Sequence, residues 1–419
     1  MRRRFKMGDP MVPVLRFPQF DKNWYYVTME TLFPKIRNGF VGTATPFYVI
    51  NGVKYLQGKN IKHGQIIDKD LININQSFHQ KQSKSILKKN DLVMVQSGHV
   101  GECAIINDEF HNSNCHALLI SSPIDTIESI FYKYFFYAES GKRNIYKIKT
   151  GNTIEHILSS DLKKITIPHP AIKEQQKIAD FLSSVDKKIE QLTRKKELLE
   201  KYKTGMMQKL FPKAGEQHPE LRFKDENGQD FPDWDVRKVG DIAQIFRGAS
   251  PRPISSPKWF SNDSLIGWVR ISDVTKSKKY LHKTEQYLSN EGVNKSRFIE
   301  PESLIMSICA TIGQPIYTKF PVCIHDGFVV FSQPKVNPEY LYYYLDKIKY
   351  SWHRYGQPGT QINLNSDIVR NENISIPNDP EQQKIADFLS AIDDKITKVE
   401  GKLIKAQTFK KGLLQQMFV

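Results

Sequence analysis

Two segments of the chain carry apolar residues in a heptad pattern, with alternating steps of four and three positions. The pattern over residues 178–210 is interrupted by Lys196 and Lys203, and the pattern over residues 385–417 only by Lys410. Two apolar positions in seven form a narrower stripe than a globular helix buries, so each segment is predicted to be a long helix lying along one partner helix. The predicted seam consists of Ile178, Leu182, Val185, Ile189, Leu192 and Leu199 in the first segment and Ile385, Leu389, Ile392, Ile396, Val399 and Leu403 in the second.

Each predicted helix begins with the same ten residues. The sequence EQQKIADFLS occupies residues 174–183 and recurs at residues 381–390, 207 positions later. An exact repeat of this length indicates a tandem duplication. The two helices are therefore expected to pair with each other as an antiparallel coiled coil, which relates the preceding domains by a pseudo-two-fold axis. A helix over residues 178–210 would span about 50 Å at about 1.5 Å per residue.

A homodimer through parallel zippers is the alternative interpretation of the seam. The presence of both copies in one chain favours the intramolecular pair, because that pair needs no second molecule.

The segments before the two helices are predicted to be related domains of mixed α and β structure. Residues 117–121 and 328–332 are short apolar runs bounded by polar residues, which is typical of buried strands. Residues 131–138 and 340–345 are rich in aromatic residues and are predicted to be helices that pack a core. The predicted fold is α+β, with two such domains in tandem, each followed by a long helix.

The predicted boundaries follow from the repeat. They are residues 12–172 for the first domain, 173–212 for its helix, 213–379 for the second domain and 380–419 for its helix.

The net charge of +16 and the pI of about 9.4 favour a polyanionic partner. No stretch has the length and hydrophobicity of a membrane span. The three arginines at residues 2–4 are not followed by the apolar region of a signal peptide. We therefore expect a cytoplasmic protein without a membrane partner.

The four cysteines, Cys103, Cys115, Cys309 and Cys323, form no CxxC motif. Alignment of the two copies places Cys115 opposite Asp326, so candidate ligands do not match between the copies. We expect no metal site and interpret the cysteines as reduced, buried thiols.

Polar positions that differ between the two copies are the candidates for reading a nucleic acid. The stretch over residues 141–153 and its counterpart over residues 347–361 combine clustered cations, glycines and Asn, Gln or Thr side chains, which suit phosphates and base edges. A solvated helix end and loop is the alternative for both stretches. The DNA-binding candidates are Lys59, Asn60, Gln96, Ser97, His99, Lys142, Arg143, Lys147, Lys149 and Asn152 in the first copy and Arg270, Ser272, Asp273, Thr311, Arg354, Gln357, Thr360 and Gln361 in the second.

Motifs for nucleotide chemistry are missing. The sequence has no GxxxxGK[ST] phosphate loop and no glycine-rich nucleotide loop after a predicted strand. We therefore expect a chain without catalytic residues that holds neither S-adenosylmethionine nor ATP. A self-contained methyltransferase-nuclease is the less favoured alternative.

Together these motifs resemble the specificity subunit of type I restriction-modification systems. The resemblance covers nearly the whole chain after about residue 12, and its most specific part is EQQKIADFLS. The motifs that carry it are the LRF openings at 15–17 and 221–223, the segments 55–61 and 96–101, the Ile-x-Ile-Pro strands at 165–168 and 374–377, and the repeated helix starts.

The resemblance implies a DNA-binding subunit with two target recognition domains, each reading one half of a bipartite, asymmetric site in double-stranded DNA. It implies that the helices set the spacer and dock two modification subunits, which methylate adenine with S-adenosylmethionine. Restriction subunits that use ATP and Mg²⁺ are expected to join them. The recognised bases and the half read by each domain stay open.

Overall fold

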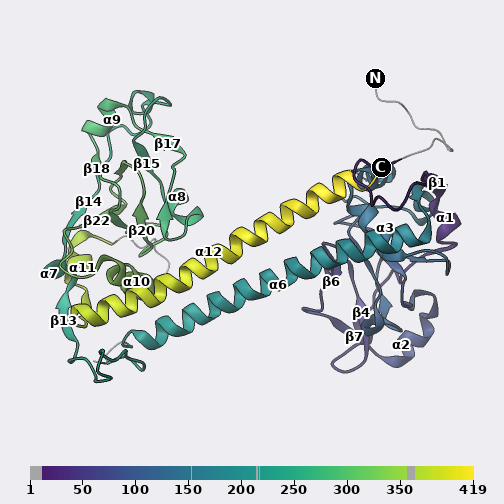
Figure 1. Ribbon diagram of the computed structural model, residues 1–419, viewed down its shortest axis with the longest axis horizontal. Coiled ribbons are helices and arrows are strands. Elements are labelled where there is room, and N and C mark those ends of the chain that lie inside the picture. Colours follow the sequence, from purple (N-terminus) through teal and green to yellow (C-terminus); the bar gives the residue numbers. More distant parts are fainter. Residues whose placement is uncertain (1–11, 152, 214–215, 217, 356–363) are drawn as a thin grey trace. The chain divides into compact units, whose positions relative to one another are not determined.

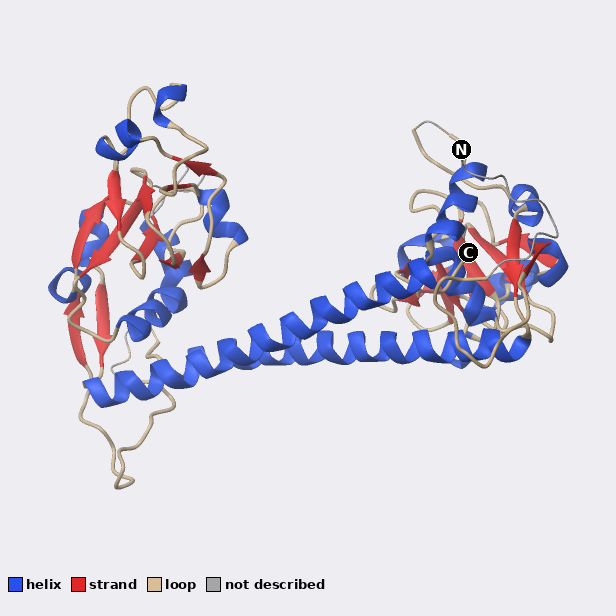
Figure 2. Cartoon of the chain, turned by 45° about the horizontal axis from the view of Figure 1, so that its top comes forward, coloured by secondary structure: helices blue, strands red, loops and turns tan. Residues whose placement is uncertain are grey.

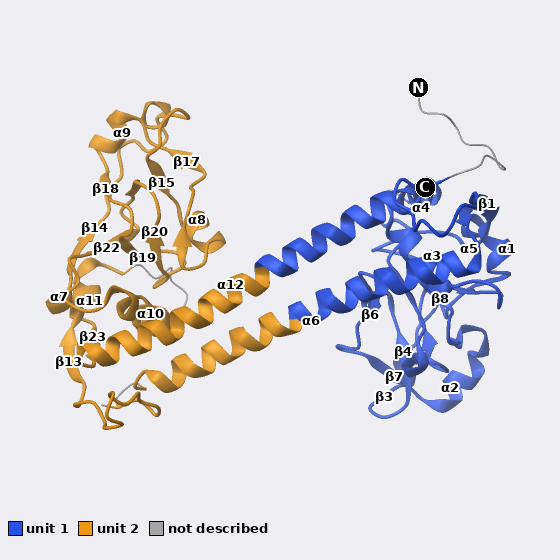
Figure 3. Ribbon diagram, viewed as in Figure 1, with its two compact units in different colours: residues 1–193, 401–419 blue, residues 194–400 orange. Residues whose placement is uncertain are grey.

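The structure is a computed structural model that describes residues 12–151, 153–213, 216, 218–355 and 364–419 (Figure 1). The chain divides into two compact units. Unit 1 comprises residues 1–193 and 401–419, and unit 2 comprises residues 194–400 (Figure 3). Each unit therefore combines one head domain with the first part of its own long helix and the last part of the other. This division differs from the predicted boundaries, which assigned each helix to a segment of its own.

The head of unit 1 contains two four-stranded sheets. In the first, the strand order is β2 (Lys35–Asn38), β11 (Leu118–Ser122), β8 (Leu92–Val95) and β9 (Cys103–Ile105). In the second, it is β10 (Asn114–Cys115), β4 (Val53–Leu56), β7 (Ile72–Ile74) and β3 (Tyr48–Val49). Two further pairs are β1 (Tyr25–Thr28) with β12 (Thr166–His169) and β5 (Ile61–Lys62) with β6 (Gln65–Ile66). The helices are α1 (Met29–Leu32), α2 (Gln76–Lys81), α3 (Ser129–Tyr137), α4 (Glu139–Ile148) and α5 (Ser159–Lys164).

The head of unit 2 repeats this plan. One sheet has the order β14 (Gln244–Arg247), β22 (Phe328–Ser332), β19 (Leu304–Ser307), β20 (Pro315–Thr318) and β16 (Tyr280–Leu281). The other has the order β17 (Gln286–Tyr287), β15 (Gly267–Val269), β21 (Val322–Ile324) and β18 (Arg297–Ile299), and β13 (Asp235–Lys238) pairs with β23 (Asn373–Ile376). The helices are α7 (Val239–Ile242), α8 (Ile271–Lys276), α9 (Asn290–Asn294), α10 (Pro338–Ile348) and α11 (Ser366–Asn371). Figure 2 shows the strands of each head gathered into sheets.

The predicted aromatic helices and apolar strands are present in both heads. Helices α3 and α10 bury most of their aromatic side chains, and strands β11 and β22 are buried along nearly their whole length. The prediction of mixed α/β heads is confirmed.

The two long helices are α6 (Ile172–Leu210) and α12 (Asp379–Gln416), and they pair within each unit. In unit 1, Ile178 and Leu182 share a core with Leu413 and Met417 from the end of α12. In unit 2, residues of the first part of α12 share a core with Met207 near the end of α6. The start of one helix thus lies against the end of the other, which is the predicted antiparallel pairing. All twelve predicted seam residues are buried or half-buried.

A buried carboxylate ties each head to its helix. Glu174 accepts two hydrogen bonds from the guanidinium of Arg16, at 2.7 and 2.8 Å, and its side chain is 2% exposed. Glu381 accepts the same pair from Arg222, at 3.1 and 2.7 Å, and also one from the indole N–H of Trp234 at 2.9 Å. These hydrogen bonds raise the pKa of both guanidinium groups. The first residue of EQQKIADFLS therefore anchors the LRF segment that opens the head.

The second residue of the repeat fixes the aromatic helix. The side-chain amides of Gln175 and Gln382 donate to the carbonyl of the proline five residues earlier, at 2.7 and 2.8 Å. Their carbonyl oxygens accept from the backbone N–H of the residue that caps α3 or α10, at 2.9 and 2.8 Å. Both side chains are buried, and in each the amide nitrogen donates and the carbonyl oxygen accepts a hydrogen bond. The occurrence of Gln in both copies therefore follows from packing inside each unit.

Tyrosine, serine, aspartate and lysine form a latch between helices in unit 1. The Tyr134 hydroxyl on α3 donates to Asp186 on α6 at 2.8 Å and lies 3.2 Å from the Ser183 hydroxyl. Asp186 also forms an ion pair with Lys410 of α12. Three helices therefore meet at one carboxylate.

The same latch occurs in unit 2 with the roles of the long helices exchanged. The Tyr343 hydroxyl on α10 donates to Asp393 on α12 at 2.7 Å, and Lys203 of α6 forms an ion pair with Asp393 at 2.7 Å. Lys203 and Lys410 were the polar interruptions of the predicted seam. Each of these lysines lies at a seam position, where it neutralises a carboxylate of the opposite helix.

Candidate nucleic-acid interface

Four strands of the first head end at one edge of its sheets. β4 and β10 run parallel and end together, since Leu56 pairs with Cys115. β2 and β8 both end beside the start of β11. The backbone N–H of Phe40 donates to the carbonyl of Cys115 at 3.0 Å and so joins the two sheets there. We call residues 39–42, 57–60, 96–101 and 116–117 the head-1 loop edge.

The second head gathers the same four loops. β15 and β21 run parallel and end together at Val269 and Ile324, and β14 and β19 end beside the start of β22. The backbone N–H of Ala249 donates to the carbonyl of Ile324 at 3.0 Å, in the manner of Phe40 and Cys115. We call residues 248–252, 270–272, 308–313 and 325–327 the head-2 loop edge.

Five predicted residues of the first copy lie on the head-1 loop edge, and one of them, Asn60, is buried. Lys59, Ser97 and His99 are exposed, whereas Gln96 is half-buried. The side-chain oxygen of Gln96 is buried and has no hydrogen-bond partner among the described residues. A hollow of about 490 Å³ opens beside this edge. It is lined by Lys62, His63, Gly98, His99, Val100, Glu102, Lys149 and Glu155.

Asn60 and Asp273 occupy equivalent positions, and both side chains hold their own loop. The Asn60 oxygen accepts from the backbone N–H of Gln57 at 3.0 Å, and its amide donates to the Ile67 carbonyl at 3.0 Å. The two oxygens of Asp273 accept backbone N–H groups at 2.8 and 3.1 Å. Both residues are at most 5% exposed. Base contact would require these bonds to break, so the geometry favours a supporting role over the predicted reading role.

The basic stretch of the first head forms α4 and a following hairpin. Lys142, Arg143 and Lys147 are exposed on α4, and Lys149 forms an ion pair with Glu155. The hairpin joins the head-1 loop edge through a bridge between residues 97 and 156. The predicted Asn152 lies outside the described residues.

Three predicted residues of the second copy lie on the head-2 loop edge. Ser272 and Thr311 are exposed, and Arg270 donates two hydrogen bonds to the side-chain oxygen of Gln286, at 2.9 and 2.6 Å. A hollow of about 610 Å³ lies here. It is lined by Arg270, Ile271, Ser272, Glu285, Gln286 and His325.

Arg354 is tied to a carboxylate and does not lie free. It forms an ion pair with Glu372 at 2.5 Å, and the hydrogen bonds that its guanidinium donates to this carboxylate raise the pKa of the guanidinium. The predicted Gln357, Thr360 and Gln361 lie outside the described residues. The backbone N–H of Leu364, just after them, donates to the Ile308 carbonyl at the head-2 loop edge.

An arginine cluster on the head-2 loop edge was missed from the sequence. Arg247 donates to the backbone carbonyl of Asp326 at 2.7 Å, and Arg252 lies 3.3 Å from its carboxylate. The Ser250 hydroxyl donates to the same carboxylate at 2.6 Å, and this bond, with the nearby Arg252, lowers the pKa of Asp326. Arg297 on β18 donates to the carbonyl of Arg247 at 2.6 Å. Arg297 is about 50 positions from the other two in the sequence, so no local motif identifies the cluster.

The structure corrects one part of the alignment between the copies. Because residues 40 and 249 bond to residues 115 and 324, Cys115 lies opposite Ile324 and not opposite Asp326. This places His116 opposite His325. The sequence alignment missed the pair because two residues follow His325 before β22 starts, whereas one follows His116 before β11 starts.

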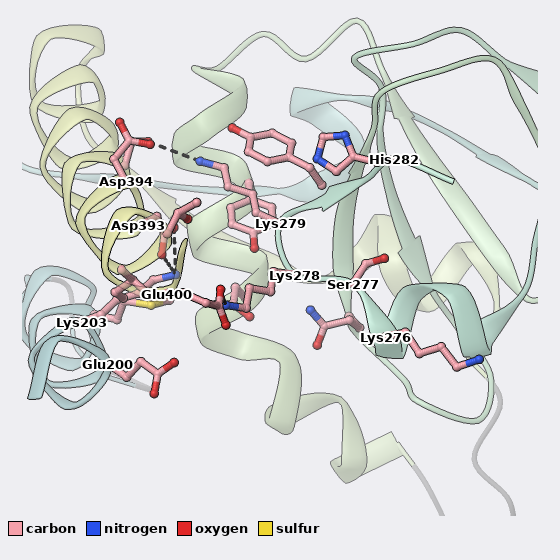
Figure 4. A pocket seen from close by; sticks show the side chains of 18 of the residues that line it. Glu200, Lys203, Lys276, Ser277, Lys278, Lys279, His282, Asp393, Asp394 and Glu400 are labelled. Carbon is pink, nitrogen blue, oxygen red and sulfur yellow. Dashed lines mark hydrogen bonds and ion pairs between the residues drawn. The ribbon is translucent and has the colours of Figure 1, made fainter. Parts of the chain in front are cut away.

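A further hollow, of about 790 Å³, lies in unit 2 where the helix pair meets the head (Figure 4). Lys203 pairs with Asp393 here and joins the two long helices, and Lys278 pairs with Glu400 and joins the head to α12. Ion pairs within the helix pair and between helix and head thus line the hollow. Among the described residues, no group of three or more His, Cys, Asp or Glu side chains is placed to hold a metal ion. No helix in the described part of the chain is long and apolar enough to cross a membrane.

The fold defines a class of protein with two diverged copies of one α/β domain, each continued by a long helix that pairs with the other. Residues 21–201 and 232–407 match the family described as "Type I restriction modification DNA specificity domain". The chain therefore belongs to this family, and it carries the domain twice. The predicted resemblance is confirmed.

Named relatives and solved structures agree with this assignment. The chain is 27% identical over 312 residues to the putative type I restriction enzyme MjaX specificity subunit of Methanocaldococcus jannaschii, which covers 71% of this chain and 69% of the relative. It is 25% identical over 365 residues to the MjaIX specificity subunit of the same organism, with 82% and 80% covered. The crystal structure of the S subunit of a type I restriction-modification system from M. genitalium superposes with a TM-score of 0.61 at 17% identity, covering 98% of this chain and 99% of that one.

Proposed function

We propose that this chain is the DNA-reading subunit of a type I restriction-modification complex and that each head reads one half of a bipartite site. One observation carries the proposal. The two heads hold the same four loops at the same edge, yet the side chains on those loops differ. A shared scaffold with different polar side chains suits two half-sites that share a shape but not a sequence.

The charges on the two loop edges differ in kind. The head-1 loop edge and the adjoining α4 present mainly lysines and histidines, with Arg143 as their one arginine, whereas the head-2 loop edge presents Arg252 and Arg270, with Arg247 directly beside it. Arginine suits bidentate contacts to guanine or phosphate, and lysine supplies point charges toward phosphates. The two heads are therefore expected to prefer different bases.

The proposal assigns the chemistry to partners. Two modification subunits would bring S-adenosylmethionine and methylate adenine, and restriction subunits would bring ATP and Mg²⁺. The paired helices would dock the modification subunits and set the spacer between the half-sites. The homodimer alternative is not favoured, because within each unit the seam of one helix is already covered by the other.

Methylation sequencing tests the proposal. The chain is expressed with its neighbouring modification subunit in a host without adenine methylation, and modified adenines are mapped across the genome. We expect one motif with two short specified halves separated by an unspecified spacer of fixed length. A continuous motif, or methylation by the chain without its partner, would refute the proposal.

A further inference from the structure

His116 and His325 occupy the same place in two heads whose loop edges otherwise share only glycines, Gly39 with Gly248 and Gly101 with Gly313. Each directly follows the short strand, β10 or β21, that runs parallel to β4 or β15. Each ring also rests on an aromatic side chain of that neighbouring strand. The ring of His116 lies 6.1 Å from that of Tyr55, and the ring of His325 lies 5.9 Å from that of Trp268.

Nδ1 of His325 accepts a hydrogen bond from the backbone N–H of Gly327 at 2.9 Å. Nδ1 of His116 lies 3.2 Å from the Tyr55 hydroxyl and is the acceptor of that pair in the tautomer with the proton on Nε2. A neutral imidazole that accepts at Nδ1 carries its proton on Nε2. Burial lowers the pKa of both histidines, which favours this neutral form.

The Nε2 atom of each ring is the nitrogen that does not contact Tyr55 or Gly327. Neither Nε2 atom has a hydrogen-bond partner within the described part of the chain, although neither ring is fully buried. The side chain of His325 is 19% exposed and lines the hollow that also contains Arg270 and Ser272. The two Nε2 atoms therefore lie at equivalent points of the two loop edges without a partner among the described residues.

We propose that His116 and His325 are the contact that both heads share, each donating its Nε2–H to a phosphate oxygen of the DNA bound at its loop edge. The inference rests on the proposed function. Two half-sites of different sequence have the sugar-phosphate backbone in common, so a residue kept at the same place in both heads suits the backbone rather than a base. These histidines would set the register of each head on the duplex while the differing residues read the bases.

The test compares two substitutions at each histidine in the full chain bound to its modification subunits. His325→Phe keeps a ring against Trp268 but removes the donor. His325→Gln keeps an amide N–H that reaches about as far as Nε2. The same pair is made at His116, and His169→Phe serves as the control, because His169 on β12 also bonds a tyrosine hydroxyl through Nδ1, at 2.8 Å, but lies outside the loop edge.

Binding is measured by fluorescence anisotropy on a duplex with the cognate site and on a duplex with one half-site scrambled. The Phe variants should bind both duplexes about ten-fold more weakly, the size expected for losing one hydrogen bond to a charged acceptor. The Gln variants and the control should bind within about two-fold of wild type, which is near the spread of surface substitutions. The slope of affinity against salt should not change, because no cation is removed.

A methylphosphonate scan of the duplex gives a second measurement that does not depend on one variant folding. Methylphosphonate at one position in each half-site should weaken binding by the wild type and by the Gln variant, but should not weaken binding by the Phe variant. The inference is overturned if folded Phe variants bind like the wild type, or if they change the methylated sequence, which would make these histidines base readers. Failure of the wild-type complex to bind either duplex would overturn the proposed function and the inference with it.

Discussion

The buried carboxylate that anchors the head of unit 2 should be less replaceable than its counterpart in unit 1. Glu381→Ala removes the whole carboxylate. The two oxygens of Glu381 accept three hydrogen bonds, from Arg222 and Trp234, whereas those of Glu174 accept two, from Arg16. Alanine has no side-chain acceptor, so three hydrogen bonds are lost at position 381 and two at position 174.

The structure sets the size of the effect. Breaking a buried ion pair by removing one partner costs about 3–5 kcal/mol. Because the Arg222 side chain is 17% exposed and that of Arg16 is 10% exposed, the lower end of that range applies to both. The additional bond from Trp234 adds about 1 kcal/mol. We expect Glu381→Ala to destabilise its unit by about 4 kcal/mol and Glu174→Ala by about 3 kcal/mol.

Hydrogen-deuterium exchange followed by mass spectrometry reports the stability of each unit separately. A single melting curve of a protein with two units does not. Glu381→Ala should speed exchange in residues 222–238 by at least about a hundred-fold, since 1.4 kcal/mol corresponds to ten-fold. Residues 16–28 should exchange as in the wild type, and Glu174→Ala should give the reverse pattern. Equal effects of the two substitutions, or unchanged exchange beside either site, would contradict the assignment of these carboxylates as anchors.

Three further outcomes follow from the contacts described. Lys203→Met should destabilise the packing of α10 by about 1–2 kcal/mol, because a half-buried ion pair is lost, and Lys410→Met should destabilise the packing of α3 in the same way. Hydrogen-deuterium exchange should therefore speed up in α10 for the first variant and in α3 for the second, and the same exchange pattern in both variants would refute the latch. Arg252→Ala should weaken binding to cognate and scrambled duplexes alike and lower the salt slope by about 0.9, and an unchanged slope would remove Arg252 from the interface. Insertion of one helical turn beside Lys196 should lengthen the spacer or abolish methylation without changing the two specified halves, and retention of the original spacer would count against the helices as spacer.

The long helices and the duplication could be predicted because their signals are local. The seam repeats every seven residues, and the exact copy needs no alignment. The reason for that exact copy could not be predicted, because the partners of Glu174 and Glu381 lie 158 and 159 residues away in the sequence. The role of Lys196 and Lys203 within the seam could not be predicted for the same reason, since each pairs with a carboxylate on the other helix.

The loop edges were only partly predictable. Gln96, Ser97 and His99 follow a recognisable buried strand, so their place could be inferred. The strand before His116 has two residues, which is too short for any hydrophobic pattern, and a one-residue difference in the next turn hid its match with His325. The reading role of Asn60 and Asp273 stays a prediction. A polar side chain that holds a backbone turn and one that faces a ligand look alike in a sequence.

Exchange of one head tests the central claim most directly. Residues 1–170 are replaced by the corresponding head of a relative with a different recognition sequence, the hybrid is expressed with the modification subunit, and methylated adenines are mapped by sequencing. If each head reads one half-site, one specified half of the motif changes while the other half and the spacer length stay the same. A change in both halves, or in neither, would contradict the account.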